Sequence, residues 1–398
     1  MVNFKKVLDI DAFSWDSFCL LVPSVISGLA VYASNTTLAS SNISNVLRVL
    51  MYLFSILIIY NCLKQKQRAS YAFPIFGVAM LYWFIGLWGN NPSWAPLYVL
   101  LMLGIAFSSD GIKCDAFRLY VDCLVVMSIL GIIAILSFLV LHILPYNIVN
   151  FYEDTTDTYF NFGIAYLFVD SQDGFRLCGL FNEPGYFGTF LSLALIAENL
   201  NFRKIKVWIM FVAGCLTFSL AFYLTLIIFI IIRKVKNPFY ILIIAVFIYV
   251  FFKILPTLSF DNRMLDVLVQ RMNISDGELA GNNRDKVNYS LLFSHFNLSS
   301  DVFFGRGIGS TRDLGVSFLM MIIQIGYVGA LLTYGSLAIV SWKLARKYWQ
   351  LIVFFLCFWI NVYQRTNIFS INYFLLLFGG MLYMGKNIKN NNPITQNE

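Results

Sequence analysis

The sequence predicts an all-α, polytopic membrane protein with about twelve transmembrane helices. Apolar runs close to the roughly 20 residues needed to cross a bilayer recur from one end of the chain to the other. Of the 398 residues, 59% are hydrophobic and only 12% are charged, whereas soluble domains carry about 25% charge. Basic clusters separate many of the apolar runs, as expected for loops that set membrane topology. We therefore expect residues 1–398 to form a single transmembrane domain.

The expected spans follow in order along the chain. The first six lie near 17–33, 46–63, 71–89, 95–108, 120–144 and 180–199. The next apolar run, 207–232, lies between two basic clusters, NFRKIK (201–206) and RKVK (233–236). If both clusters are cytoplasmic, this run crosses twice, as two short helices that meet near Thr217–Ser219; a single long helix would invert everything downstream. The last spans lie near 239–255, 316–341, 348–364 and 369–385.

The basic residues agree with this topology and place both termini in the cytoplasm. Of the 28 lysines and arginines, 18 fall in the proposed cytoplasmic segments, and 13 of those 18 are lysine. Of the other ten, eight are arginine, and most of these fall in two outer loops, 145–179 and 257–315.

Arginine in outer loops favours a site for an anion. Its planar fork of donors matches phosphate bidentately, and the group stays charged. The alternative is that these arginines pair with nearby acids such as Asp261, Asp266, Asp285 and Asp313. Pairing explains the excess of arginine over lysine less well.

The first candidate motif is RLCGLFNEPGYFG, residues 176–188, where an outer loop meets a span. In a purely local interpretation, Asn182 caps the helix, Glu183 favours the helix dipole and Pro184 begins the first turn. In a functional interpretation, Glu183 is an ionisable residue at membrane depth, where charge is costly and usually serves a function. Arg176 and Glu183 could also pair with each other.

The second candidate motif is NNRDKVNYSLLFSHF, residues 282–296, which predicts an amphipathic helix on the membrane surface. Arg284 falls in its first turn, and Leu291, Leu292 and Phe296 share its apolar face. His295 is the only histidine in an outer loop. It is a candidate general base, although a partly buried neutral histidine is the more common reason for a lone one.

The third motif, FFGRGIGSTRD (303–313), is a glycine-rich turn that carries Arg306 and Arg312. Its glycines suit a phosphate cradle and equally suit a tight loop between helices. The turn lacks the GK[ST] ending of a nucleotide-binding loop. In the span that follows, Gly326, Gly329 and Ala330 predict close helix packing.

Other residue types exclude several kinds of site. The seven cysteines contain no CxxC pair, and there are only two histidines, so no disulfide framework, metal site or other cofactor is indicated. The net charge of +7 follows from lysine-rich cytoplasmic loops and does not indicate a nucleic-acid partner.

Taken in order, these motifs resemble the bacterial O-antigen polymerase (Wzy) group, within the superfamily of O-antigen ligases and polymerases. The resemblance covers roughly residues 170–335. It implies a GT-C-like helical fold in the bacterial inner membrane, with a large periplasmic loop that contains short helices. The implied reaction polymerises undecaprenyl-pyrophosphate-linked oligosaccharide repeat units by inverting, metal-independent glycosyl transfer. The implied partners are that lipid-linked oligosaccharide, membrane lipid and a separate chain-length-determining co-polymerase.

The resemblance also implies roles for individual residues. Arg176 and Arg284 match the family's recurrent outer-loop arginines, so both are expected to bind the pyrophosphate and stabilise the charge that develops on it. Glu183 would orient an arginine or accept the acceptor proton, and His295 is the other catalytic candidate. Candidates of second rank for substrate binding are Arg271, Arg306, Arg312 and Asn182.

Two other functions stay open. Related ligases carry a histidine just before the span that matches 316–341, where this chain has Ser317; this difference favours a polymerase over an O-antigen ligase. A flippase for polysaccharide units would need charged residues along the middle of its spans, where this sequence has few.

Overall fold

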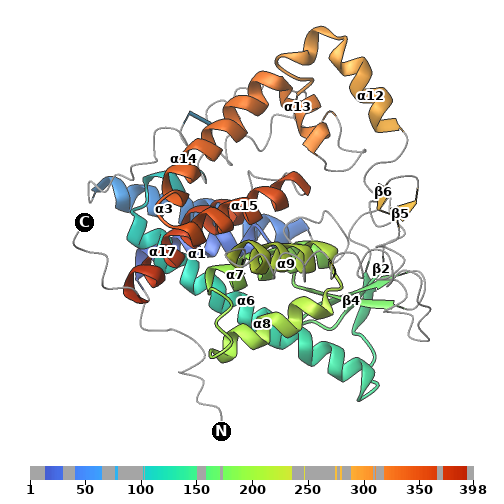
Figure 1. Ribbon diagram of the computed structural model, residues 1–398. Coiled ribbons are helices and arrows are strands. Elements are labelled where there is room, and N and C mark those ends of the chain that lie inside the picture. Colours follow the sequence, from blue (N-terminus) through green and yellow to red (C-terminus); the bar gives the residue numbers. More distant parts are fainter. Residues whose placement is uncertain are drawn as a thin grey trace. The chain divides into compact units, whose positions relative to one another are not determined.

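The computed structural model describes residues 14–29, 41–64, 77–78, 102, 104–149, 158–170, 174–234, 246, 274–275, 278–279, 288–307, 310, 318–364 and 371–391. This part of the chain is mostly helical (Figure 1). It forms two compact units, each discontinuous in sequence. Unit 1 comprises Met1–Ser27, Val46–Val121 and Arg284–Glu398, and unit 2 comprises Gly28–Asn45 and Asp122–Asn283.

Within the described residues, three helical stretches are long and apolar enough to cross a membrane. They are Asn45–Lys64 within α3 (Ser41–Lys64), α6 (Asp110–Leu139) and the stretch Phe318–Ala345. Shorter apolar helices lie at other expected spans, including α1 (Trp15–Ile26), α7 (Pro184–Ala197) and α15 (Trp349–Gln364). The helical membrane character is thus confirmed. The number of about twelve spans stays a prediction, and the expected spans near 71–89 and 239–255 lie almost wholly outside the described residues.

The last helices of unit 1 contain two segments of wider, π-type winding. The first, η7 (Leu331–Gly335), joins α13 (Phe318–Ala330) to α14 (Ser336–Ala345). The second, η8 (Leu375–Gly379), joins α16 (Ile371–Phe374) to α17 (Gly380–Asn391). A Cβ at Gly379 would lie 2.7 Å from Cβ of Phe117 and 2.8 Å from the carbonyl oxygen of Lys113. The wide turn therefore packs directly on the first turns of α6, where only a glycine fits.

Unit 2 contains a four-stranded antiparallel sheet, so the all-α expectation is wrong for the loop 145–179. Its strands follow one another in space as in sequence: β1 (Asn147–Val149), β2 (Thr158–Asn161), β3 (Tyr166–Asp170) and β4 (Gly174–Gly179). The β2–β3 turn is closed by Asn161, whose side-chain oxygen accepts from the Gly163 amide at 2.7 Å, and Gly163 has a positive φ.

Both faces of this sheet are apolar, which fixes its position in unit 2. One face forms a cluster of Val149, Tyr159, Tyr166 and Cys178. On the other face, Phe160 and Phe175 contact the ring of Phe138, which lies in the last turn of α6. Burial on both sides stabilises a sheet whose strands are only 3–6 residues long.

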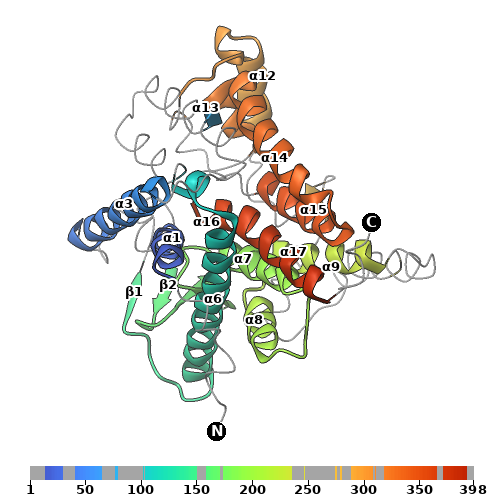
Figure 2. The same ribbon diagram turned by 90° about the vertical axis from the view of Figure 1, so that its left-hand side faces the viewer.

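Three short helices complete unit 2 and lie side by side: α7, α8 (Ile205–Leu216) and α9 (Leu220–Lys234) (Figures 1 and 2). The expectation that 207–232 forms two helices that meet near Thr217–Ser219 is confirmed, and the single long helix is wrong. The break is built by Phe218, whose φ of 45° belongs to the left-handed region and ends the helix. Arg233, near the end of α9, donates to the carbonyl of Asn199 at 3.0 Å. The end of α9 therefore lies beside the connection that precedes α8.

Candidate functional site around Arg176

The described residues include five of the eight site residues expected from the sequence. Arg176, Asn182 and Glu183 belong to unit 2, whereas His295 and Arg306 belong to unit 1. The other three lie outside the described residues: Arg271, Arg284 and Arg312. The sites in the two units are therefore built up separately.

Arg176 projects from strand β4 toward the break between α8 and α9. Its Nε donates to the carbonyl oxygen of Thr217 at 3.2 Å, and its Nη2 donates to that of Phe218 at 3.3 Å. Across the β3–β4 ladder it faces Phe168, and its guanidinium lies 5.8 Å from the centre of that ring. The side chain is half-buried. Its guanidinium is therefore held in one orientation by groups from two separate parts of the fold.

The break supplies these two carbonyls because its own hydrogen bonds fix its shape. The hydroxyl of Thr217 donates to the carbonyl of Gly214 at 2.6 Å and accepts from the Ser219 amide at 3.3 Å. The Tyr223 hydroxyl donates to the carbonyl of Cys215 at 2.8 Å and so ties α9 back to α8. The last carbonyls of a helix carry partial negative charge, which favours a cation at this place. Arg176 therefore acts as a cap for the C-terminal end of α8.

Helix α7 passes close to the same break. A Cβ at Gly188 would lie 2.8 Å from Cβ of Ser219 and 2.9 Å from the Thr217 hydroxyl oxygen, so no larger residue fits without a shift. This contact places the first turns of α7 beside the carbonyls that hold Arg176.

At the start of α7 the structure corrects one local expectation. The capping position is occupied by Glu183 in extended conformation, rather than by Asn182, and the Glu183 side chain makes no capping hydrogen bond. Pro184 takes the first helical position, as expected. The local interpretation therefore holds for Pro184 and agrees with the place of Glu183 at the positive end of the helix dipole, whereas the capping role given to Asn182 is wrong.

The charges of Arg176 and Glu183 both affect the ionisation of the buried Cys178 thiol. Burial raises the pKa of the Cys178 thiol; the charge of Arg176 lowers it, and that of Glu183 raises it. Both charges thus lie within electrostatic reach of Cys178, which is fully buried. β4, which carries Arg176, and α7, which begins just after Glu183, also pack against each other in unit 2.

His295 lies on α12 (Asn288–Asn297) in unit 1 and is exposed, so the interpretation as a partly buried histidine is wrong. Phe296 is fully buried, and it stacks with Phe293 against Tyr327 of α13. The amphipathic character expected for 282–296 is thus present in the described part of that segment, and His295 stays a candidate base accessible to solvent.

The glycine-rich turn packs against a break in α13. Gly326, inside that helix, has φ 70° and ψ 172°, and Gly305 has φ 81°. A Cβ on Gly305 would lie 2.3 Å from the carbonyl oxygen of Gln324, and one on Gly326 would lie 2.2 Å from that of Phe303. The small residues of this span therefore allow a backbone-to-backbone contact, as their size suggested, although the break itself was not expected.

Two of the turn's amides make this contact, and a third closes the turn itself. The amides of Gly305, Arg306 and Gly307 donate to the carbonyls of Asp301, Ile323 and Gln324, at 2.6, 2.8 and 3.0 Å. These groups are the donors that a phosphate cradle would need. The geometry thus supports the tight-loop interpretation of Gly305–Gly307 rather than the cradle.

Arg306 itself pairs with a carboxylate. Its Nε lies 3.3 Å from Oδ2 of Asp301, and its guanidinium lies 6.0 Å from the Phe296 ring centre. Structural pairing, the alternative stated for the outer-loop arginines, therefore applies to Arg306. Its partner was not among the acids expected, although it lies only five residues away in sequence.

Sequence reasoning missed the groups that hold Arg176. Phe168 and Tyr223 belong to no recognisable sequence motif. The Thr217 and Phe218 carbonyls are main-chain groups, which every residue possesses, so the sequence does not single them out. The sheet could have been found from the aromatic and β-branched residues of YFNFGIAYLFVD and from the turn signal Asn161-Phe162-Gly163.

Comparisons with protein-family models, curated proteins and solved structures find no match for this chain. The resemblance to O-antigen polymerases thus stays a prediction that rests on the motifs. Within the described ranges, no group of three or more His, Cys, Asp or Glu side chains is placed to hold a metal ion.

Proposed function

We propose that the protein polymerises lipid-pyrophosphate-linked oligosaccharide units into a surface polysaccharide at the outer face of the bacterial inner membrane. A glycan would pass from its undecaprenyl pyrophosphate to a sugar hydroxyl of a second lipid-linked unit. Two features support this proposal: the mostly helical chain with candidate membrane spans, and the order of the motifs between residues 170 and 335.

The orientation of Arg176 is the observation that carries the proposal furthest. Carbonyl groups and an aromatic ring hold its guanidinium in one orientation. A charge held in place before the substrate arrives needs no reorganisation when the sugar–phosphate bond breaks, and this lowers the barrier for departure of the pyrophosphate. Glu183, which directly precedes α7, would orient the arginine or accept the acceptor proton.

Transport of lipid-linked units is a second candidate because α6 carries buried ionisable residues. Asp122 is 8% exposed, and it lies about 18 Å along the axis from Asp110, close to the middle of this 30-residue helix. Lys113, in the first turn, is fully buried, with Nζ 3.9 Å from Oδ1 of Asp110. Ionisable residues inside a span commonly mark transport pathways. Asp122 therefore adds a buried ionisable residue to α6, although it lies near the start of the expected span 120–144.

Deletion of the gene, followed by gel analysis of the surface polysaccharide, separates the candidates. If the ladder of bands from long polysaccharide chains disappears while one repeat unit is retained on lipid A, the result supports the polymerase. Polymer that accumulates on the carrier lipid indicates an O-antigen ligase. Purified protein in liposomes decides between polymerase and transporter: products of two or more repeats support the former, and movement of units without bond formation supports the latter.

A further inference from the structure

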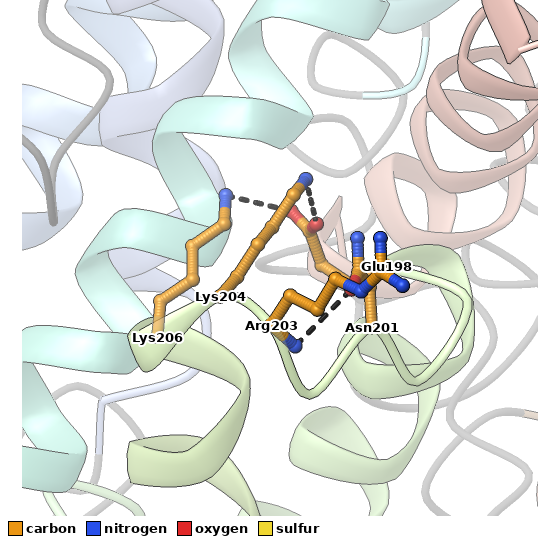
Figure 3. A network of polar contacts seen from close by, with 5 residues as sticks. All are labelled: Glu198, Asn201, Arg203, Lys204 and Lys206. Atoms are coloured by element: carbon orange, nitrogen blue, oxygen red, sulfur yellow. Dashed lines mark hydrogen bonds and ion pairs between the residues drawn. The ribbon is translucent and has the colours of Figure 1, made fainter.

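The connection between α7 and α8 forms a basic corner at the opposite end of the helices from Arg176. The basic corner consists of Glu198, Arg203, Lys204, Lys206 and Arg233. Figure 3 shows that Lys204 and Lys206 converge on the carboxylate of Glu198. The Lys204 ammonium lies 2.7 Å from one carboxylate oxygen, and that of Lys206 lies 2.6 Å from the other. The Glu198 side chain is fully buried, so the pair of lysines fixes the connection to the end of α7.

Positive charge exceeds negative charge in this corner. Four cations stand against one carboxylate among its residues, all in the described part of the chain. Both ammonium groups of the lysines share the single carboxylate of Glu198, and the N-terminal end of α8, where Lys204 is the capping residue, adds partial positive charge. Such a cluster favours an anion beside it.

Two arginines present this charge to the surface. Arg203 is exposed, and its amide is held by the Asn201 side-chain oxygen at 3.2 Å. Arg233 is also exposed, and the 3.0 Å bond to the carbonyl of Asn199 brings it to the same connection from the end of α9. The connection is rigid at this point, since Asn199 and Leu200 both take left-handed conformations tied back to α7 by their amides.

An exposed apolar face begins at the basic corner. Ile205, Trp208 and Val212 lie at helical spacing on one side of α8 and are 50, 48 and 42% exposed. The indole of Trp208 donates to the carbonyl of Phe202 at 2.9 Å and packs on the rings of Phe202 and Phe211. A tryptophan with its polar atom satisfied and its ring exposed is typical of the level where headgroups meet acyl chains.

We propose that the basic corner binds the phosphate headgroup of an acidic phospholipid. The acyl chains lie along Ile205, Trp208 and Val212, while Arg203, Lys204 and Arg233 contact the headgroup. A lipid fits better than a soluble anion because the cationic surface is continuous with an apolar one, and a lipid satisfies both.

The test compares the double variant Arg203→Gln, Arg233→Gln with the double variant Lys343→Gln, Arg346→Gln. All four side chains are exposed, and the second pair removes the same charge from α14 and its end. Purified protein in neutral detergent is titrated with phosphatidylglycerol, phosphatidylcholine and inorganic phosphate. Native mass spectrometry measures retained lipid, and the unfolding temperature measures stabilisation.

For the wild type we expect saturable retention of phosphatidylglycerol and little of phosphatidylcholine. Each basic group near an anionic lipid surface strengthens binding about fivefold, so the first double variant should bind phosphatidylglycerol about 30-fold more weakly. The control pair should stay close to the wild type. If phosphatidylglycerol binding weakened equally in both double variants, the effect would come from general surface charge, and the proposed lipid site would be wrong. Equal stabilisation by inorganic phosphate, or equal retention of phosphatidylcholine, would overturn the assignment to an acidic lipid.

Discussion

Replacement of Arg176 separates a structural role from a catalytic one. Its two bonds to carbonyl oxygens measure 3.2 and 3.3 Å, which is long for a charged donor. Hydrogen bonds to charged groups contribute about 1.5–3 kcal/mol each, so the lower value applies and Arg176→Ala should lose about 3 kcal/mol of stability. Arg176→Lys should lose about half of this, since an ammonium reaches one carbonyl but cannot reproduce the fork.

The proposed catalytic role adds a separate effect on rate. Removal of one donor that stabilises developing negative charge typically lowers the rate about 100- to 1,000-fold. We therefore expect Arg176→Ala to lose at least about 100-fold in polymerisation per folded molecule, and Arg176→Lys to retain part of the rate because it keeps the charge. If the arginine only caps α8, both variants should polymerise normally per folded molecule and differ only in stability.

The assay reconstitutes each purified variant in liposomes with lipid-linked repeat units and measures the initial rate of products with two or more repeats. Size-exclusion chromatography gives the folded amount, and the unfolding temperature gives the loss of stability. Arg346→Ala, at the exposed end of α14, is the matched control for removal of an arginine. A normal chain-length distribution from folded Arg176→Ala protein would refute the role of this residue.

Three further predictions follow from other sites. Gly326→Ala should lose at least about 2 kcal/mol, because the new Cβ meets the Phe303 carbonyl at a left-handed position; thermal unfolding measures this. Glu198 lies just after α7, and burial alone would raise the pKa of its carboxyl group. Lys206 and Lys204 instead lower this pKa below the ordinary 4.5. The ion pairs therefore stabilise the fold at neutral pH, and this contribution is lost as the pH falls below about 4.5. Unfolding between about pH 7 and pH 3 should accordingly show a smaller acid-induced loss in Glu198→Gln than in the wild type. His295→Ala should leave the unfolding temperature unchanged, since the side chain is exposed, so a fall in polymerisation rate in this variant would report on chemistry.

The sequence predicted best those features that depend on patterns along the chain. The break in 207–232 was expected because basic clusters flank an apolar run that would otherwise reverse the topology, and it lies at Thr217–Ser219 as stated. Pro184 begins α7 because its fixed φ and missing amide suit the first turn. Neither inference needed a long-range contact.

Features that depend on distant contacts could not be predicted in the same way. The sheet escaped detection because its strands are short and both faces carry aromatic residues, so alternation of polar and apolar residues is weak. The partners of Arg176 are main-chain carbonyls 41 and 42 residues away, and a carbonyl leaves no mark in the sequence. The sequence left open whether the glycine-rich turn cradles a phosphate or forms a tight loop, and the break in α13, which accepts from two of its amides, could not be predicted.

If the basic corner lies at headgroup level, as proposed, the helical lengths in unit 2 would place Arg176 toward the opposite membrane surface. With 12 and 15 residues, α8 and α9 are about 18 and 22 Å long, whereas the hydrocarbon core is about 30 Å thick. With the basic corner at headgroup level, the break at Thr217–Ser219 lies beyond the middle of the bilayer, and the sheet that carries Arg176 must approach it from the other side. If the lysine-rich side is cytoplasmic, as the positive-inside rule predicts, Arg176 would reach the break from the outer face. An arginine held at that depth is costly unless it serves a function, and the outer face is where a lipid-linked pyrophosphate would meet it.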